Sequence, residues 1–213
     1  MQVIAHRGLW QRPEQKNSAG AIRGAVEQGF GVEVDLRDRA GRLVVSHDIP
    51  DESAGDFEEL LISLAELPAF RIVPWALNIK ADGLQRLVAD VVDRLGLTGA
   101  FCFDMSVPDG LGYLKLDSSC RVYTRQSEFE NPPPFYDEAD GVWLDEFNSS
   151  WITDDIIDGH RRRNKQMCIV SAELHGREHL PQWERLKKLP SYRNNVLQLC
   201  TDHPVQAREF FGD

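Results

Sequence analysis

The stretch Gly31-Val-Glu-Val-Asp-Leu36 decides which fold this sequence predicts. Side chains alternate between the two faces of a strand, so Glu33 and Asp35 share one face and the apolar residues around them share the other. The apolar character of the whole segment is typical of a central strand in a parallel sheet. The competing interpretation is an edge strand whose two carboxylates face solvent.

On both sides of this segment, short apolar runs alternate with helical patterns. Eight such runs, most of them followed by a helical pattern, predict a (β/α)₈ TIM barrel, an α/β fold with a single compact domain over residues 1–213. The alternative is a doubly wound open sheet, but residues 6–8 lack the Gly-rich first turn that such a sheet uses for a nucleotide. The predicted strands are Gln2–Ala5, Gly31–Leu36, Ile72–Lys80, Ala100–Asp104, Cys120–Tyr123, Gly141–Leu144, Met167–Val170 and Asn195–Leu199. The predicted helices are Ser18–Gln28, Phe57–Glu66, Leu84–Leu95, Pro108–Leu116, Thr153–Arg163, Pro181–Leu189 and Pro204–Phe211, and residues 126–139 are expected to form a loop.

Composition and charge narrow the class of partner. The formal net charge of −10 argues against nucleic acid or an anionic membrane surface as a partner. The N-terminus has no charged start followed by an apolar run, and no window approaches the length of a membrane span. The four cysteines form no CxxC pair and are expected to be reduced. These features predict a cytoplasmic protein that acts on a small molecule, and they do not indicate an oligomeric state.

Polar residues end three of the predicted strands, and barrel active sites gather at these carboxyl ends. The first strand ends in His6-Arg7-Gly8, and the third carries Asn78-Ile-Lys80. Two carboxylates side by side within a barrel need positive charge beside them. Arg7 and Lys80 supply some of it and are candidates for binding a substrate phosphate, although each is equally a candidate for a structural salt bridge. A hard divalent cation with oxygen ligands supplies the rest.

A second histidine is expected to return to the carboxylates. Residues 38–42 are typical of a turn between two extended segments, so His47 would fold back beside Glu33 and meet His6. Two histidines beside a cation suit phosphodiester cleavage, because one accepts a proton from the attacking hydroxyl and the other donates one to the leaving oxygen. The other four histidines, His160, His175, His179 and His203, are expected to be structural.

These motifs together resemble those of the glycerophosphodiester phosphodiesterase family and its barrel relatives. The matching segments are Ala5-His-Arg-Gly8, Glu33-Val-Asp35, Val44–Asp48 and Asn78-Ile-Lys80, with a weaker match at Thr201-Asp-His-Pro204. The resemblance implies a phosphoric diester hydrolase in which a neighbouring substrate hydroxyl attacks phosphorus and a cyclic phosphate forms. It also implies a small glycerol- or sugar-linked phosphodiester as the substrate.

The resemblance further implies roles for individual residues. His6 and His47 would be the acid/base pair, and Glu33, Asp35 and position 78 would hold the metal. Mg²⁺ is the expected ion, with Ca²⁺ or Mn²⁺ as alternatives.

Three departures from the family pattern are visible. Asn78 stands where the family has a metal-binding carboxylate, so the site loses one charge. The family's Glu-Asn-Thr before the first helix is here Lys16-Asn-Ser18 or begins at a displaced Glu14, and the family's long insertion is cut to residues 49–59. Glu173, on the loop after the seventh strand, is a candidate replacement for the lost carboxylate, with Asp104 and Asp145 as similar candidates at other strand ends.

Three other functions are compatible with these residues. A lyase-like enzyme of the sphingomyelinase D type would stop at the cyclic phosphate. A catalytically impaired barrel with Asn78 would bind a phosphodiester or metabolite as a sensor. A Schiff-base enzyme would use Lys80 as a nucleophile, but a lysine beside two carboxylates stays protonated.

Overall fold

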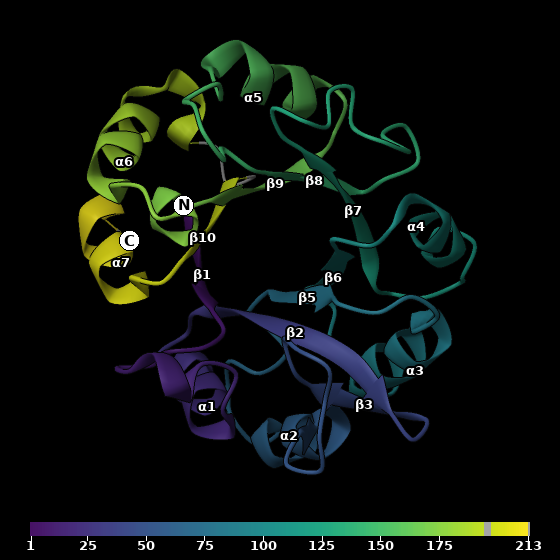
Figure 1. Cartoon of the computed structure of the whole chain (residues 1–213). Coiled ribbons are helices and arrows are strands. Elements are labelled where there is room, and N and C mark those ends of the chain that lie inside the picture. The colour runs from purple at the N-terminus through teal and green to yellow at the C-terminus, as the bar shows by residue number, and fades with distance from the viewer. Residues whose placement is uncertain (194–196, 213) are drawn as a thin grey trace.

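The computed structural model describes residues 1–193 and 197–212, and within them eight parallel strands close into a barrel (Figure 1). The order around the barrel is β1-β10-β9-β8-β7-β6-β5-β2, and pairing of β2 with β1 completes the ring. The predicted TIM barrel is thus confirmed. The barrel strands are β1 (Gln2–His6), β2 (Gly31–Arg39), β5 (Trp75–Ile79), β6 (Ala100–Phe103), β7 (Arg121–Gln126), β8 (Gly141–Leu144), β9 (Gln166–Val170) and β10 (Leu197–Thr201).

Helices surround the barrel on the outside (Figure 1). Ser18 caps α1 by accepting a hydrogen bond from the backbone N–H of Ala21, and Gly96 ends α3 in the left-handed conformation. No described helix combines the length and the apolar character needed to cross a membrane. The α-helices are α1 (Ala19–Glu27), α2 (Phe57–Leu64), α3 (Gln85–Leu95), α4 (Val107–Tyr113), α5 (Asp154–Arg162), α6 (His179–Lys188) and α7 (Pro204–Phe211). Three 3₁₀ helices are η1 (Pro13–Gln15), η2 (Ala172–His175) and η3 (Pro190–Arg193).

The predicted elements differ from the observed ones mainly at their ends. The strand predicted over Ile72–Lys80 begins only at Trp75, because Pro74 lacks an N–H for pairing and Ile72 is 77 % exposed. The last strand is observed as Leu197–Thr201, and the start of its predicted range, residues 195–196, lies outside the described residues. Residues 127–140, which are described throughout, join β7 to β8 without an α-helix, so this connection is the proline-rich loop that the sequence predicted.

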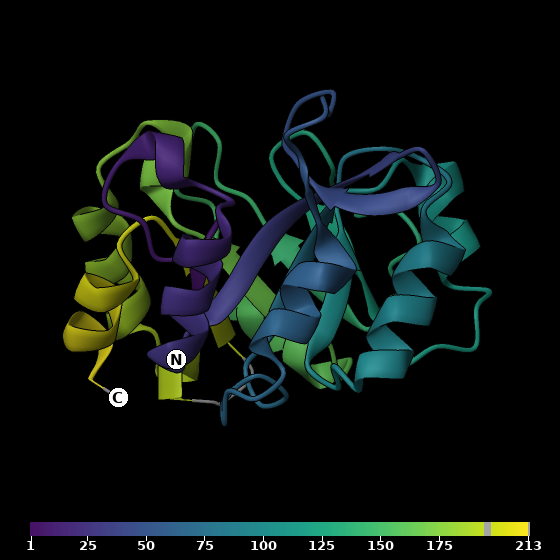
Figure 2. The same cartoon turned by 90° about the horizontal axis from the view of Figure 1, so that it is seen from below.

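An antiparallel extension rises above the barrel at β2. The strand β2 continues past the barrel and turns back as β3 (Arg42–Val45), which then pairs with β4 (Gly55–Asp56). Figure 2 shows this extension and the loop beyond it projecting from the end of the barrel where the parallel strands finish. The backbone N–H of Ser46 donates to the carbonyl of Asp35 (3.1 Å), so the chain does return to the carboxylate strand, as the turn pattern predicted.

Alternation along the strands produces two separate apolar cores. Val32, Val34 and Leu36 face outward and join the large core between strands and helices. Inside the barrel, aromatic rings fill the space beneath the strand ends: Phe101 stacks on Tyr123 (centroids 4.0 Å apart) and Phe103 on Trp143 (3.7 Å). The barrel interior is therefore a packed core of aromatic rings, with inward-facing polar residues at the mouth above it and a second polar group, which includes Arg121, Gln166 and Gln198, at the opposite end.

Gly8 brings the loop after β1 against the first turn of α1. Its φ is +90°, and a Cβ at this position would lie 2.6 Å from the carbonyl carbon of Ala21. We expect Gly8→Ala to lower the free energy of unfolding by about 1–3 kcal/mol, because backbone must move to relieve the contact. Gly20→Ala is the matched control: that position is helical and has open space around it, so the change should be neutral or stabilising. Urea titrations followed by circular dichroism measure both, and equal effects would contradict the prediction.

Candidate active site

Strand β2 presents both carboxylates to the inside of the barrel. Glu33 is 1 % exposed and Asp35 is fully buried. The Nε of Arg7 lies 2.8 Å from Asp35 Oδ2, and the Nζ of Lys80 lies 3.6 Å from Asp35 Oδ1. Asn17 also donates to Asp35 Oδ2 (2.8 Å). Asp35 is therefore compensated by two cations, as a buried carboxylate must be.

Glu33 has a different environment. Its Oε1 accepts a hydrogen bond from Asn78 Nδ2 (3.0 Å), and its Oε2 accepts one from the backbone N–H of Arg7 (3.1 Å). Burial raises the pKa of Glu33, while His6 opposes the shift and Asp35 adds to it. A divalent cation bound here would favour the ionised carboxylate and so oppose this rise in pKa.

The donor set at this point fits a hard cation. Asp35 Oδ1 and Asn78 Oδ1 are both buried and have no hydrogen-bond partner among the described residues, and the register of β2 against β5 places these two residues side by side. Together with Glu33 they offer two carboxylates and one amide oxygen, the ligand types that Mg²⁺, Mn²⁺ and Ca²⁺ prefer. Within residues 1–193 and 197–212, however, no group of three or more His, Cys, Asp or Glu side chains is arranged to hold a metal. Asn78 leaves the site one charge short of such a group.

His6 ends β1 beside the carboxylates. Its Nδ1 donates to Asp202 Oδ1 (2.6 Å), and its Nε2 lies 3.9 Å from Glu33 Oε2. Lys16 holds the other oxygen of Asp202 (3.1 Å). Partial burial opposes ionisation of Asp202, but the hydrogen bond from His6 and the pairing with Lys16 outweigh it and lower its pKa. An ionised aspartate on Nδ1 fixes the ring and leaves Nε2 for proton transfer.

A cavity of about 250 Å³ opens at the mouth of the barrel between these side chains. His6, Arg7, Glu33 and Asn78 line one side of it. Residues between β6 and η2 form the other side of the cavity, and the rings of Phe103 and Trp143 form its floor. These further lining residues are Phe103, Asp104, Arg125, Trp143, Asp145, Phe147, Val170, Leu174 and His175. His6, Arg7, Glu33 and Asn78 thus meet in one cavity, whereas the predicted residues Asp35 and Lys80 are paired with each other and are not among its lining residues.

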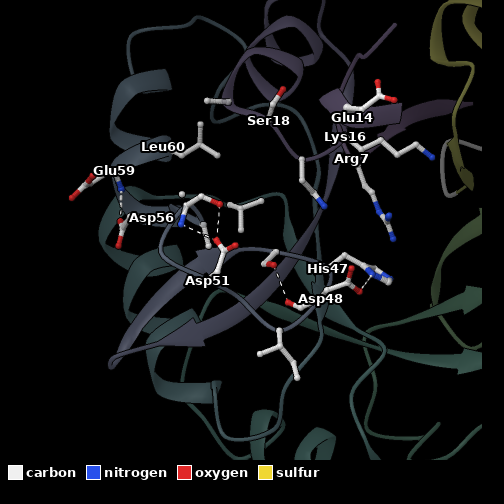
Figure 3. A pocket seen from close by; sticks show the side chains of 18 of the residues that line it. Arg7, Glu14, Lys16, Ser18, His47, Asp48, Asp51, Asp56, Glu59 and Leu60 are labelled. Carbon is white, nitrogen blue, oxygen red and sulfur yellow. Dashed lines mark hydrogen bonds and ion pairs between the residues drawn. The ribbon is translucent and has the colours of Figure 1, made fainter. Parts of the chain in front are cut away.

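His47 lies elsewhere. Its side chain is 48 % exposed, its Nδ1 is bonded to the exposed Asp48 (2.9 Å), and it lines a second, larger cavity of about 810 Å³ between the β1–α1 loop and the β3–β4 loop. Figure 3 shows the guanidinium of Arg7 extending toward His47 from the other wall. Arg7 lines both cavities and so stands between His47 and the barrel-mouth cavity. The hairpin was predicted correctly, but the histidine was expected closer to Glu33.

Lys80 joins a chain of ion pairs that runs along the rim. Its Nζ lies 3.4 Å from Asp104 Oδ2, and Asp104 Oδ1 in turn lies 2.5 Å from Arg125 Nη1. Arg125 also pairs with Glu130 through Nε (2.7 Å). Each cation is therefore held by a carboxylate, and Arg125 and Asp104 also line the barrel-mouth cavity. Fixed cations of this kind suit a phosphate group better than freely rotating ones.

Glu173 does not meet the metal-site candidates. Its Oε2 accepts from Ser171 Oγ (2.5 Å), and its Oε1 accepts from Thr201 Oγ1 (2.5 Å) and the backbone N–H of Asp202 (3.0 Å). Both oxygens are therefore used to join β9 to β10, and Glu173 is absent from the lining of the barrel-mouth cavity. The prediction that it replaces the lost carboxylate has no support in this geometry.

Several residues at the mouth were missed as functional candidates. Asp202 belongs to the segment with the weaker match to the family, and Asn17 belongs to the segment that matches the family's Glu-Asn-Thr only in part. The sequence therefore predicted no role for either residue. Arg125 carried no signal, because its partner Asp104 is far from it in sequence. His175 was expected to be structural, but it lines the barrel-mouth cavity. Asp104 and Asp145, which the sequence offered as minor candidates, line the same cavity.

Backbone strain is concentrated at the same place. Arg7 (φ 59°), Asn17 (φ 61°) and Asp104 (φ 69°) adopt the left-handed region, which residues with a Cβ seldom occupy. All three contribute to the polar network around Asp35 and Lys80. Such conformations persist where the surroundings enforce them, and they are frequent at functional sites.

Comparison with known proteins supports the fold and leaves the activity open. No family model matches the chain, and no curated protein matches it. Among solved structures, a barrel from Galdieria sulphuraria, provisionally named a glycerophosphodiester phosphodiesterase, is similar with a TM-score of 0.79 and 14 % identity, covering 100 % of this chain and 98 % of that one. A glycerophosphodiester phosphodiesterase from Agrobacterium tumefaciens is similar with a TM-score of 0.66 and 16 % identity (99 % and 98 % covered). An Oleispira antarctica phosphodiesterase, solved with the product sn-glycerol-3-phosphate, gives 0.66 and 13 % (100 % and 97 %).

These likenesses show that the chain has the barrel fold found in glycerophosphodiester phosphodiesterases. The matched regions cover nearly the full length of this chain and of each solved structure. The similarity therefore extends from the motifs in the first 80 residues to the whole barrel.

Proposed function

We propose that the protein is a phosphodiester hydrolase whose reaction centre is the cavity of about 250 Å³ at the barrel mouth. The observation that carries this proposal is the convergence of His6, Arg7, Glu33 and Asn78 on that cavity, with two buried oxygens of the site lacking hydrogen bonds. The fold supports it, because solved structures of the same architecture are phosphodiesterases. A histidine, a cation and paired carboxylates are the groups that phosphodiester cleavage requires.

Glu33, Asp35 and Asn78 would hold a divalent metal, with Mg²⁺ the best match to their oxygens. When bound, the metal would neutralise charge that develops on the phosphoryl oxygens. Arg7 would bind and orient the phosphate from the side of β1, and Lys80 from the side of β5. Because Asp35 and Asp104 already hold these two cations in place, little side-chain entropy would be lost when the phosphate binds.

His6 would exchange the reacting proton at Nε2, with Asp202 holding Nδ1. The sequence predicted His47 as the second acid/base group, but His47 lines the adjoining cavity, so it would reach only a part of the substrate that extends past Arg7. The lining of that cavity includes four serines, Asn17 and five carboxylates, and their hydrogen-bonding groups suit a polar glycerol or sugar moiety.

The two histidines are tested by hydrolysis of bis(p-nitrophenyl) phosphate and of glycerophosphodiesters by His6→Ala and His47→Ala. The proposal expects loss of turnover in the first variant, and loss in the second only if His47 takes part in chemistry. Full activity of His6→Ala, with its fold confirmed by circular dichroism, would contradict the proposal.

A second candidate function is a sensor barrel that binds a phosphodiester without cleaving it. The observation in its favour is that Asn78 donates a hydrogen bond to Glu33, where a third carboxylate would complete a strong metal site. Binding of a glycerophosphodiester without turnover in any metal would favour this function.

Position 78 also offers a prediction. We expect Asn78→Asp to tighten Mn²⁺ or Mg²⁺ binding by about 10- to 100-fold, because ligand charge sets the affinity of oxygen sites for hard cations. Without metal the same change should lower the melting temperature, since three carboxylates would then repel one another. Calorimetric titration and thermal unfolding with and without Mn²⁺ measure the two effects. Unchanged affinity in the variant would show that the cation does not bind at this position.

A further inference from the structure

A second histidine–aspartate pair faces the barrel-mouth cavity. His175, the last residue of η2, lines the cavity and is 19 % exposed. Its Nε2 lies 2.8 Å from Oδ1 of Asp145, which follows β8 and is 4 % exposed. In the ring of eight strands, β8 is four strands away from β2 in either direction. The pair therefore stands across the cavity from Glu33.

The ring of His175 is held from several directions. It packs on Phe147 with centroids 4.5 Å apart, and Glu128 fixes the Phe147 loop by accepting the backbone N–H of Phe147 (3.1 Å) and of the two residues after it. Burial opposes ionisation of Glu128, but these backbone hydrogen bonds outweigh it and lower its pKa to about 2. The η2 turn itself is fixed by Glu173, which joins Ser171 to Thr201. A ring fixed this firmly meets the requirement for a preorganised proton-transfer group.

The hydrogen bonds of His175 differ from those of a structural histidine. His160 uses both ring nitrogens, with Tyr136 at Nδ1 (2.7 Å) and Gln126 at Nε2 (2.8 Å), and burial lowers its pKa to about 4. In His175 only Nε2 is bonded within the described part of the chain, so Nδ1 is left for a ligand in the cavity. His6 is likewise bonded to an aspartate through one ring nitrogen, but there Nδ1 contacts Asp202 and Nε2 faces the cavity.

The charged groups around the pair come from several elements. Burial raises the pKa of Asp145, and the hydrogen bond with His175 opposes that shift. Arg125 and Asp104 line the same cavity and largely compensate each other through their ion pair. Arg177, which follows the turn, donates to the backbone carbonyls of Glu146 and Ser149 and so holds the neighbouring loop. Asp145 is thus the anion in direct contact with the imidazole.

Building on the phosphodiesterase function proposed above, we propose that His175, positioned by Asp145, donates the proton to the leaving oxygen of the phosphodiester. As the bond from phosphorus to that oxygen breaks, its electron pair stays on the oxygen and the proton of Nδ1 moves onto it, so that a neutral alcohol leaves and His175 becomes neutral. The attacking hydroxyl forms the new bond to phosphorus and gives its proton to Nε2 of His6. Proton donor and acceptor then stand on opposite walls, as displacement in line at phosphorus requires.

The test uses two diesters that share a glycerol half and differ in the leaving group. The 4-nitrophenolate of glycerol 3-(4-nitrophenyl phosphate) leaves without a proton, whereas the methoxide of glycerol 3-(methyl phosphate) needs one. For His175→Gln we expect kcat/KM to fall by about 10²- to 10⁴-fold with the methyl ester and by less than about tenfold with the nitrophenyl ester. Each substrate is the control for the other, because misfolding lowers both rates equally.

The variant Asp145→Asn tests whether Asp145 positions His175 for proton transfer or only stabilises the fold. Its kcat/KM should fall selectively with the methyl ester, by a smaller factor than in His175→Gln. The basic limb of its pH–rate profile should also shift toward lower pH, because the imidazolium loses its counter-ion. His47→Gln is measured in parallel to locate the proton donor. Equal losses with both esters in His175→Gln, or a selective loss in His47→Gln alone, would overturn this inference while leaving the hydrolase function standing. Failure of the wild-type protein to cleave either ester in any metal would overturn the proposed function itself.

Discussion

His6→Asn is expected to reduce kcat for a phosphodiester by about 10²- to 10⁴-fold, the usual worth of a positioned acid/base group. Asparagine keeps a polar group near Asp202 and lacks the ring nitrogen that lies 3.9 Å from Glu33, so it removes proton transfer while disturbing the fold little. The loss should appear mainly in kcat, because in the proposed site Arg7 and Lys80 would bind the phosphate independently of the histidine. Steady-state kinetics with bis(p-nitrophenyl) phosphate measure it.

Asp202→Asn is the matched comparison for His6→Asn. The histidine is then present but is no longer oriented by an anion, so a smaller loss is expected. If His6→Asn keeps more than about a third of wild-type activity, a loss far below the usual range for such groups, His6 has no part in proton transfer and the assignment fails.

Arg185→Met is expected to lower the free energy of unfolding by about 3–5 kcal/mol, because it leaves a buried carboxylate without its counter-ion. Glu146 follows β8 and is fully buried, and both of its oxygens accept from Arg185 Nη2 (2.7 and 2.6 Å). Its two other partners, the backbone N–H of Ile152 (2.8 Å) and Gln182 (3.1 Å), are neutral and cannot replace the lost charge.

Arg94→Met provides the matched control, since Arg94 pairs with Glu58 on the surface and both side chains are well exposed. Exposed ion pairs contribute up to about 1 kcal/mol to the free energy of unfolding, so we expect Arg94→Met to change stability little. Urea titrations at pH 7, followed by tryptophan fluorescence and circular dichroism together, compare the two variants. Similar midpoints for both would show that the buried pair does not stabilise the barrel.

The fold was predictable because local patterns and barrel geometry agree. Each buried strand leaves an apolar run, and the alternation in residues 31–36 places Glu33 and Asp35 inward regardless of where the strand ends. Strand ends were less certain, because residues 72–74 extend the apolar run although the strand begins only at Trp75. The loop between β7 and β8 was recognised from its three prolines, which exclude a helix.

The candidate site was predictable where it lies on strands and less so where it lies on loops. His6, Glu33 and Asn78 meet because parallel strands bring their carboxyl ends to one edge. His47 belongs to a loop whose direction depends on tertiary contacts, so a correct hairpin still placed its side chain in a different cavity. His175 and Asp145 are 30 residues apart, and only the closed barrel brings them together.

The central claim, that the barrel mouth is a metal-assisted phosphodiesterase centre, is tested most directly by metal dependence of turnover. The EDTA-treated protein would be assayed with bis(p-nitrophenyl) phosphate and with glycerophosphodiesters, before and after addition of Mg²⁺, Mn²⁺ or Ca²⁺. We predict negligible hydrolysis after EDTA and recovery with at least one of these ions, in the wild-type protein and not in Glu33→Gln. No hydrolysis with any ion, or hydrolysis that EDTA leaves unchanged, would contradict the claim.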